Sequence, residues 1–226
     1  MIQEKKIEIA CFNLASVLIA EKSGADRVEL CDNIALGGTT PNSHLVQQAQ
    51  THLSLPLYAM IRPRGGNFSY SNSEFDQMKS DICALKKLGV NGFVFGILKD
   101  DQTIHVEQNS ELVALASPLP CSFHRAFDEV LNYQQALEAI ISCGFSTLLT
   151  SGTFPNVMEG KDVLKQLVIQ ANNRIEIMPG GGLRSTNILE LNERVHANWY
   201  HSSAITDGTE IANPNEISQL KKKLQS

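Results

Sequence analysis

The chain has no long apolar run, little basic charge and few aromatic residues. Its 226 residues include 19 lysines and arginines against 24 aspartates and glutamates, which gives a formal net charge of −5. A nucleic acid or an anionic membrane would favour a basic face, so we expect neither as a partner. The first apolar stretch, residues 7–12, has only the length of a strand and contains Glu8. We therefore expect no signal peptide and no membrane span there.

The chain also lacks paired cysteine motifs. Its five cysteines are odd in number, and no two of them are spaced as Cys-x-x-Cys: Cys11, Cys31, Cys83, Cys121 and Cys143. This usage favours reduced thiols and a cytoplasmic location. Cys11 and Cys31 end two neighbouring predicted strands, where a soft metal such as Cu(I) could bind, but two thiols are too few for a zinc site.

Short β-rich apolar runs alternate eight times with longer segments of helical period. We predict strands at residues 7–12, 27–31, 57–62, 92–98, 121–125, 147–151, 175–178 and 199–203. We predict helices that begin near Ser16, Ser43, Ser73, Val106, Tyr133, Met158, Thr186 and Asn215, with Ser73 and Asp76 forming a capping box. Eight near-equal units predict an α/β fold, a single (β/α)₈ TIM barrel domain over residues 1–226. The first strand is not followed by the glycine fingerprint of a dinucleotide-binding sheet.

Charged residues interrupt the predicted strands, mostly toward their ends. They include Glu8, Glu29, Arg62, His124 and Arg125. A buried charge without a partner is costly, so these groups must pair with one another or meet a ligand. The C-terminal mouth of a barrel is where such groups converge. The sequence therefore predicts one polar site there, with His201 from the last strand beside it.

The third strand runs into Arg62-Pro63-Arg64-Gly65-Gly66. Arginine grips carboxylate or phosphate in bidentate fashion, so Arg62 and Arg64 are candidate anion ligands. The alternative is a pair of arginine–carboxylate bridges to Glu8 or Glu29 across the barrel. Both interpretations remain open at this point.

The later strands end in residues with similar potential. His124 is a candidate general base with Asp128 to orient it, and Arg125 is a candidate ligand contact. The alternative for His124 is a structural core histidine. A glycine run follows the seventh strand and small hydroxyl residues end the eighth, a composition typical of a barrel phosphate site. The alternative is that the glycines only shape a tight turn. The candidate ligand residues on the last three strands are Thr150, Ser151, Gly180, Gly181, Gly182, His201 and Ser203.

The same segments resemble the CutC family of copper homeostasis proteins. The matching runs are GADRVELC at 24–31, GGTTP at 37–41, MIRPRGG at 60–66, FHRAFD at 123–128, LTSG at 149–152 and MPGGG at 178–182. The resemblance implies a (β/α)₈ barrel, a cytoplasmic location, a homo-oligomer (a dimer or a tetramer) and a role in copper tolerance. It also implies Cu(I) bound by cysteines of the first two strands. Cys31 matches that pattern, but the family's first-strand cysteine falls on Ala10.

Three functions remain open for such a chain. It could be a copper-handling protein with Cu(I) as cargo. It could be a barrel enzyme acting on a small anionic or phosphorylated substrate, with Glu8, Glu29, His124 and Asp128 as acid/base candidates. It could also be a barrel that only binds a ligand. The fold alone does not choose among them.

Overall fold

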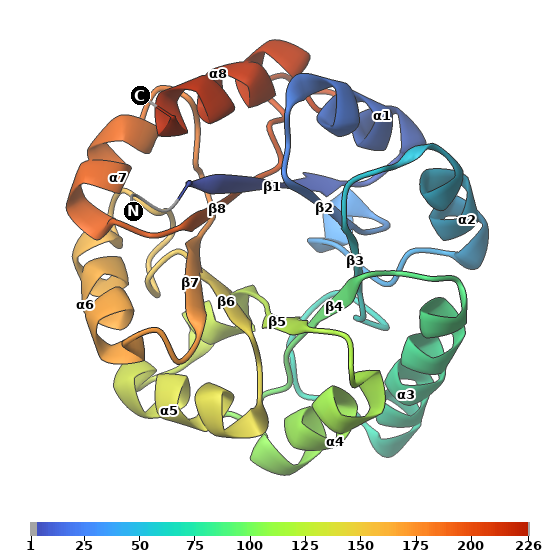
Figure 1. Cartoon of the computed structure of the whole chain (residues 1–226). Helices are drawn as coiled ribbons and strands as arrows, with labels where there is room; N and C mark the ends of the chain where they lie inside the picture. Colours follow the sequence, from blue (N-terminus) through green and yellow to red (C-terminus); the bar gives the residue numbers. More distant parts are fainter. Residues whose placement is uncertain (1–3, 226) are drawn as a thin grey trace.

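Eight strands and eight α-helices alternate along the computed structural model, which describes residues 4–225 (Figure 1). The strands are β1 (Lys6–Cys11), β2 (Arg27–Leu30), β3 (Leu57–Met60), β4 (Gly92–Phe95), β5 (Cys121–Phe123), β6 (Thr147–Thr150), β7 (Glu176–Pro179) and β8 (Trp199–Ser202). The helices are α1 (Leu14–Ser23), α2 (Ser43–His52), α3 (Asn72–Lys87), α4 (Val106–Ala116), α5 (Tyr133–Cys143), α6 (Lys161–Ala171), α7 (Ile188–Val195) and α8 (Pro214–Leu224). The short 3₁₀ helices η1 (Ile34–Leu36) and η2 (Arg125–Glu129) follow β2 and β5.

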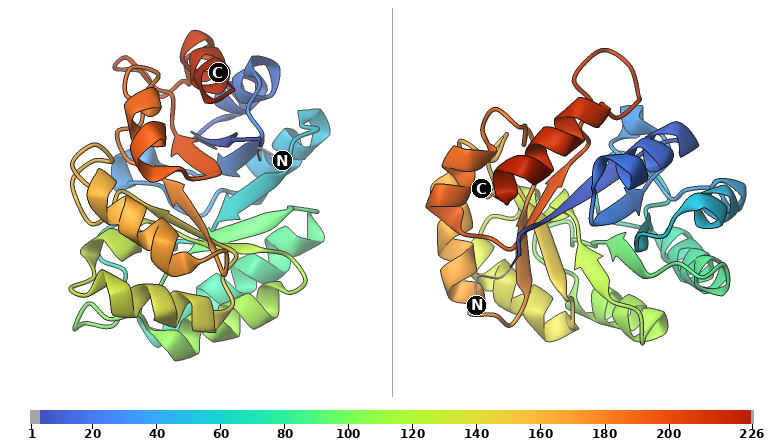
Figure 2. Two further views of the ribbon diagram at one scale, coloured as in Figure 1. Left: turned by 60° about the vertical axis from the view of Figure 1, so that its left-hand side comes forward. Right: turned by 45° about the horizontal axis from the view of Figure 1, so that its top comes forward.

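The strands form one parallel sheet in the order β7-β6-β5-β4-β3-β2-β1-β8. β1 pairs with both β2 and β8, and β7 meets β8 through a parallel bridge between Gly180 and His201. The sheet therefore curls into a nearly closed barrel, and in both views of Figure 2 the helices form a layer outside it. The predicted (β/α)₈ TIM-barrel fold is confirmed. No helix within residues 4–225 is long and apolar enough to cross a membrane.

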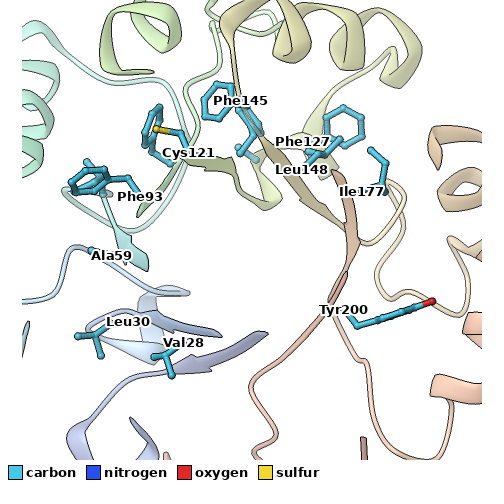
Figure 3. Packing of buried hydrophobic residues seen from close by; sticks show 14 of the residues in the cluster. Val28, Leu30, Ala59, Phe93, Cys121, Phe127, Phe145, Leu148, Ile177 and Tyr200 are labelled. Atoms are coloured by element: carbon cyan, nitrogen blue, oxygen red, sulfur yellow. The ribbon is translucent and has the colours of Figure 1, made fainter. Parts of the chain in front are cut away.

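The outward-facing strand residues form the main hydrophobic core. Side chains alternate between the two faces of a strand, so every second residue points to the helices. Figure 3 shows Val28, Leu30, Phe93, Leu148 and Tyr200 among the buried side chains of this core. The remaining alternate positions point into the barrel and leave room there for the polar groups.

Helix ends follow local chemistry. Gly24 and Gly144 end α1 and α5 at φ values of 89° and 90°, a left-handed conformation that glycine adopts without strain. The predicted capping box is displaced by two residues. Ser71 caps α3, because its hydroxyl accepts from Glu74 N–H and the Glu74 carboxylate accepts from Ser71 N–H. Ser73 instead lies in the first turn.

Candidate functional site

A pocket of about 280 Å³ opens at the C-terminal ends of the strands. Its walls include apolar side chains from Phe12, Met60, Phe68 and Leu149. Its carboxylate, imidazole and guanidinium groups come from five segments: Glu29, Arg62, His124, Arg125, Arg184 and His201. Five of these are residues that the sequence analysis places at the mouth. Glu8, the sixth residue expected there, lies beneath the pocket.

The strand register explains why a cavity remains inside the barrel near the C-terminal ends of the strands. Inward-facing residues of alternate strands form layers in a TIM barrel. Following the register around the barrel, one layer contains Glu29 and His201, and the next layer toward the mouth contains Ala10, His124 and Gly180. Ala10 and Gly180 are small, so a cavity remains above Glu29 and His201.

A buried ion pair forms the floor under this cavity. Glu8 is fully buried and pairs with Arg27, whose guanidinium lies 4.1 Å from the ring centroids of both Tyr58 and Trp199. Burial alone would raise the pKa of Glu8, but Arg27 and then His201 outweigh it and hold this pKa at about 2. Glu8 therefore remains ionised and holds its neighbours, a role unlike the proton transfer expected of it.

Glu29 and His201 face each other at the base of the pocket. His201 Nδ1 bonds Glu8 Oε1 at 2.8 Å, and its Nε2 lies 3.7 Å from Glu29 Oε2. Burial raises the pKa of Glu29 to about 7, against the lowering effect of His201. Burial would lower the pKa of His201, but the carboxylates of Glu29 and Glu8 raise it. A carboxyl group and an imidazole, both with a raised pKa, thus face each other at the base of the pocket and are candidates for proton transfer.

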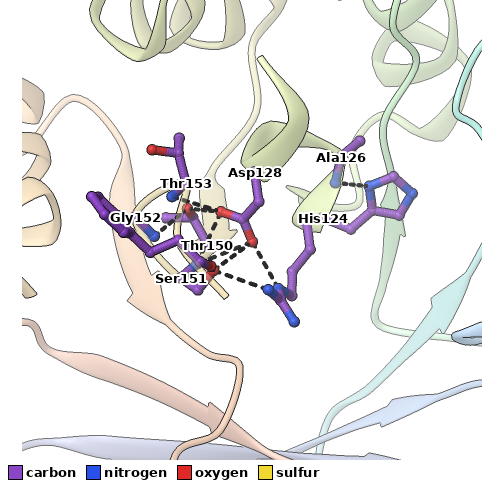
Figure 4. Close-up of polar contacts among 9 residues, drawn as sticks. His124, Ala126, Asp128, Thr150, Ser151, Gly152 and Thr153 are labelled. Carbon is purple, nitrogen blue, oxygen red and sulfur yellow. Dashed lines mark hydrogen bonds and ion pairs between the residues drawn. The ribbon is translucent and has the colours of Figure 1, made fainter. Parts of the chain in front are cut away.

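His124 is a neutral hydrogen-bond donor. Its Nδ1 accepts from Ala126 N–H at 3.3 Å (Figure 4), so the ring proton is on Nε2. Burial and then the nearby Arg62 charge lower the pKa of His124 to about 3. This state differs from the general base that the sequence suggests, because Nε2 has no lone pair to accept a proton.

The two arginines of the loop after β3 have separate roles. Arg62 is buried, and its Nη atoms donate to the carbonyl oxygens of Leu36, Gly38 and Gly66. The alternative that Arg62 bridges to Glu8 or Glu29 is wrong, because within residues 4–225 Glu8 pairs with Arg27 and His201, and Glu29 pairs with His201. Arg64 is not among the pocket residues, and its side chain pairs with Glu74 at 2.5 Å.

Asp128 does not orient His124, contrary to the expectation from sequence. Its carboxylate accepts from Thr150 Oγ1, Ser151 N–H and Arg125 Nε, the last at 2.7 Å (Figure 4). Asp128 thus ties η2 to the end of β6 and fixes Arg125 at the rim. Thr150 and Ser151 serve this network and are not pocket residues.

The segment after β7 supplies a residue that sequence reasoning missed. Gly181 and Gly182 line the pocket, and a Cβ at Gly181 would lie 2.9 Å from the Arg125 guanidinium carbon. Arg184 lies two residues further on, with Nη1 donating to Ser202 Oγ and Nη2 to Ile205 carbonyl oxygen. In the sequence, an arginine two residues after the Gly180–Gly182 run could have indicated this pocket residue. Ser203 also reaches the pocket, whereas Gly180 is not among its lining residues.

The donor set for Cu(I) is poor. Cys31 lines the pocket, but burial and then Glu29 raise the pKa of its thiol well above the usual value. Ala10 lies opposite without a ligand atom, and Cys11 packs in the outer core toward the helices. Residues 4–225 hold no group of three or more histidines, cysteines or carboxylates arranged for a metal ion. The residues present therefore do not fit a two-thiolate copper site.

Comparisons with solved structures support the barrel fold. A crystal structure described as a copper homeostasis protein CutC from Streptococcus agalactiae superposes with a TM-score of 0.85 at 34% identity, covering 89% of this chain and all of that one. A structure described as an aldolase, QR15, superposes at 0.69 with 16% identity over 89% of this chain and 91% of that one, which shows the shared fold alone. The fold is thus a (β/α)₈ barrel with a pocket at the C-terminal ends of its strands.

Sequence relatives then identify the family. The model of the CutC family matches residues 5–206. A copper homeostasis protein cutC homolog of Homo sapiens is 42% identical over 88% of this chain and 72% of its own length. A CutC family protein of Chromobacterium violaceum is 43% identical over 89% of this chain and 81% of its own. The chain belongs to the CutC family of copper homeostasis proteins.

Proposed function

We propose that this chain is a barrel enzyme that binds a small anionic substrate in the pocket and moves a proton on it. One observation carries the proposal. Glu29 Oε1, Arg62 Nε and His124 Nε2 are buried polar atoms without a hydrogen-bond partner within residues 4–225, and all three side chains line one pocket. An unsatisfied buried group costs about 1–3 kcal/mol, so three at one cavity favour a ligand that satisfies them.

The charges favour an anion. Arg62 and Arg184 donate to carbonyl and hydroxyl oxygens, so no carboxylate in these contacts cancels their charge. Arg125 adds a third guanidinium at the rim, where it is partly neutralised by Asp128. Three arginines around one small cavity create a field that attracts a carboxylate or a phosphate. Glu29 and His201 at the base supply the proton donor and acceptor.

Copper handling is the second candidate, because the family's proteins carry that name. We propose that Cu(I), if it is a cargo of this chain, binds weakly through Cys31. A single inward thiol of high pKa offers only one soft ligand, and Cu(I) prefers thiolate partners.

Titration calorimetry with phosphate and with oxalate tests the anion proposal. We expect saturable binding to the wild type and a dissociation constant raised at least about tenfold in Arg62→Gln, since a charge-assisted hydrogen bond contributes about 1.5–3 kcal/mol. Arg64→Gln is the matched control, because Arg64 lies in the same loop but outside the pocket. Equal losses in both variants, or no binding to the wild type, would contradict the proposal.

A further inference from the structure

Two unpartnered N–H groups of the pocket belong to one small unit. The Phe68 ring contacts both of their side chains, with its centroid 4.6 Å from the Arg62 guanidinium carbon and 4.8 Å from the His124 ring centroid. Arg62 Nε–H and His124 Nε2–H are both buried and unsatisfied within residues 4–225. Both side chains therefore contact one aromatic ring and line the same pocket.

Both donors are held in place before any ligand arrives. Three backbone carbonyls fix the Arg62 guanidinium, and Ala126 N–H fixes the His124 ring through Nδ1. A Cβ at Gly96 would lie 2.8 Å from His124 Nδ1, so glycine is needed to admit the ring. Rigid donors that need no rearrangement are the kind that stabilise an oxygen as it gains negative charge.

The third unpartnered atom is a proton acceptor. Glu29 Oε1 has no partner among the described residues, and the carboxyl group lies in the layer directly below that of His124. A carboxylate under a pair of fixed donors suits a substrate whose carbonyl oxygen meets the donors and whose adjacent carbon meets the carboxylate. A glutamate base combined with a neutral imidazole donor is an effective arrangement for such carbonyl chemistry, because the imidazole polarises the carbonyl without carrying a charge of its own.

We propose, resting on the anion-binding enzyme proposed above, that the reaction is proton abstraction from the carbon beside a carbonyl. Glu29 takes the proton as the C–H bond breaks, and that electron pair forms the C=C bond. The carbonyl π electrons move onto oxygen, and Arg62 Nε–H and His124 Nε2–H hold the resulting enolate. Return of the proton to carbon restores neutral carbonyl and free carboxylate, so no oxidant or second reactant is consumed. Arg125 and Arg184 hold the anionic group of the same substrate.

Deuterium exchange tests this step without knowledge of the natural substrate. Pyruvate and dihydroxyacetone phosphate each carry a carbonyl in a small anion, and proton NMR in D₂O follows loss of the signal from the carbon beside it. We expect wild-type protein to accelerate exchange in at least one of them. Glu29→Gln should lower the accelerated rate about 10²–10⁴-fold, as removal of a general base does. His124→Phe should lower it about 10²–10³-fold, as loss of one oxyanion donor does.

The conservative variant and the control separate chemistry from folding. His124→Gln keeps an N–H donor and should recover part of the exchange lost in His124→Phe, while Arg64→Gln should exchange like the wild type. Exchange that is unaffected by Glu29→Gln, or absent from the wild type with both probes, overturns the proposed step. Calorimetry with oxalate on the same preparations then decides the broader proposal. Retained binding leaves an anion-binding enzyme of another chemistry, and no binding removes both.

Discussion

His124 is a residue whose protonation state is set by the fold, and this has a measurable effect on stability. Its pKa falls from the usual value of 6.5 to about 3 because burial and the Arg62 charge both oppose the imidazolium. Between these two values the unfolded chain binds a proton at this site and the folded chain does not. Stability contributed by neutral His124 is therefore lost as the pH falls below 6.5.

The expected loss is about 1.4 kcal/mol per pH unit, or roughly 2 kcal/mol between pH 6.5 and pH 5. Urea unfolding at both pH values, on wild type and His124→Phe, measures it. The variant should lack this part of the pH dependence, whatever its absolute stability. His44→Gln, at an exposed histidine, is the control and should retain the wild-type slope. Parallel slopes for all three proteins would mean that His124 is protonated in the folded state.

At the scale of single elements, two substitutions can check at which residue α3 begins. Ser71 and Glu74 close a capping box, whereas Ser73 lies within the first turn. We expect Ser71→Ala to destabilise the protein by about 1 kcal/mol, the usual cost of losing an N-cap. Ser73→Ala should be nearly neutral, because Ser73 caps no backbone N–H. Thermal or urea unfolding of the two variants compares them, and a larger loss for Ser73→Ala would restore the boundary expected from sequence.

The alternation of short apolar strands with helical segments made the fold and the residues at the strand ends predictable from sequence. The pairing between their side chains was not predictable, for a physical reason. The pattern of apolar runs places all eight strands, and strand ends bring Glu29, Arg62, His124, Arg125 and His201 to one mouth. Pairing among side chains is not encoded by spacing. Asp128 bonds Arg125 and the β6 end instead of His124, and Arg27 takes Glu8, because geometry between distant segments selects the partner.

The alternation in β1 also decides how many thiols face the interior of the barrel. Ala10 points into the barrel and Cys11 points to the helices, so Cys31 has no inward thiol opposite it. We expect weak Cu(I) binding by the wild type and, in Ala10→Cys, an affinity higher on the order of 100-fold, because a second thiolate completes a soft donor pair. Competition against a Cu(I) chelator measures both proteins.

Two further variants control the copper experiment. Ala10→Cys combined with Cys31→Ser should return to weak binding, since only one inward thiol remains. Tight stoichiometric binding by the wild type that Cys11→Ser abolishes would show that the Cys11 thiol reaches the site and does not face the helices.

At the scale of the whole molecule, the barrel closes where the first and last segments of the chain pack together. β1 pairs with β8, and α8 packs beside α1, so the two ends of the chain complete the barrel together (Figure 1). Asp26 connects these parts. Its carboxylate accepts from Ile7 N–H at 2.8 Å and from Lys221 Nζ of α8 at 2.7 Å. One largely buried carboxylate thus links the start of β2 to both β1 and α8.

We expect Asp26→Ala to destabilise the fold by about 2–4 kcal/mol, because it leaves a partly buried backbone N–H without its acceptor and removes the nearer of the two carboxylates beside Lys221. Asp26→Asn keeps an oxygen for Ile7 N–H and should cost less. The control is the exposed pair of Arg174 and Glu138, where Glu138→Gln should cost clearly less than Asp26→Ala. Urea unfolding ranks the three variants. If Asp26→Ala costs no more than Glu138→Gln, closure of the barrel rests on the apolar contacts of α8 and not on this carboxylate.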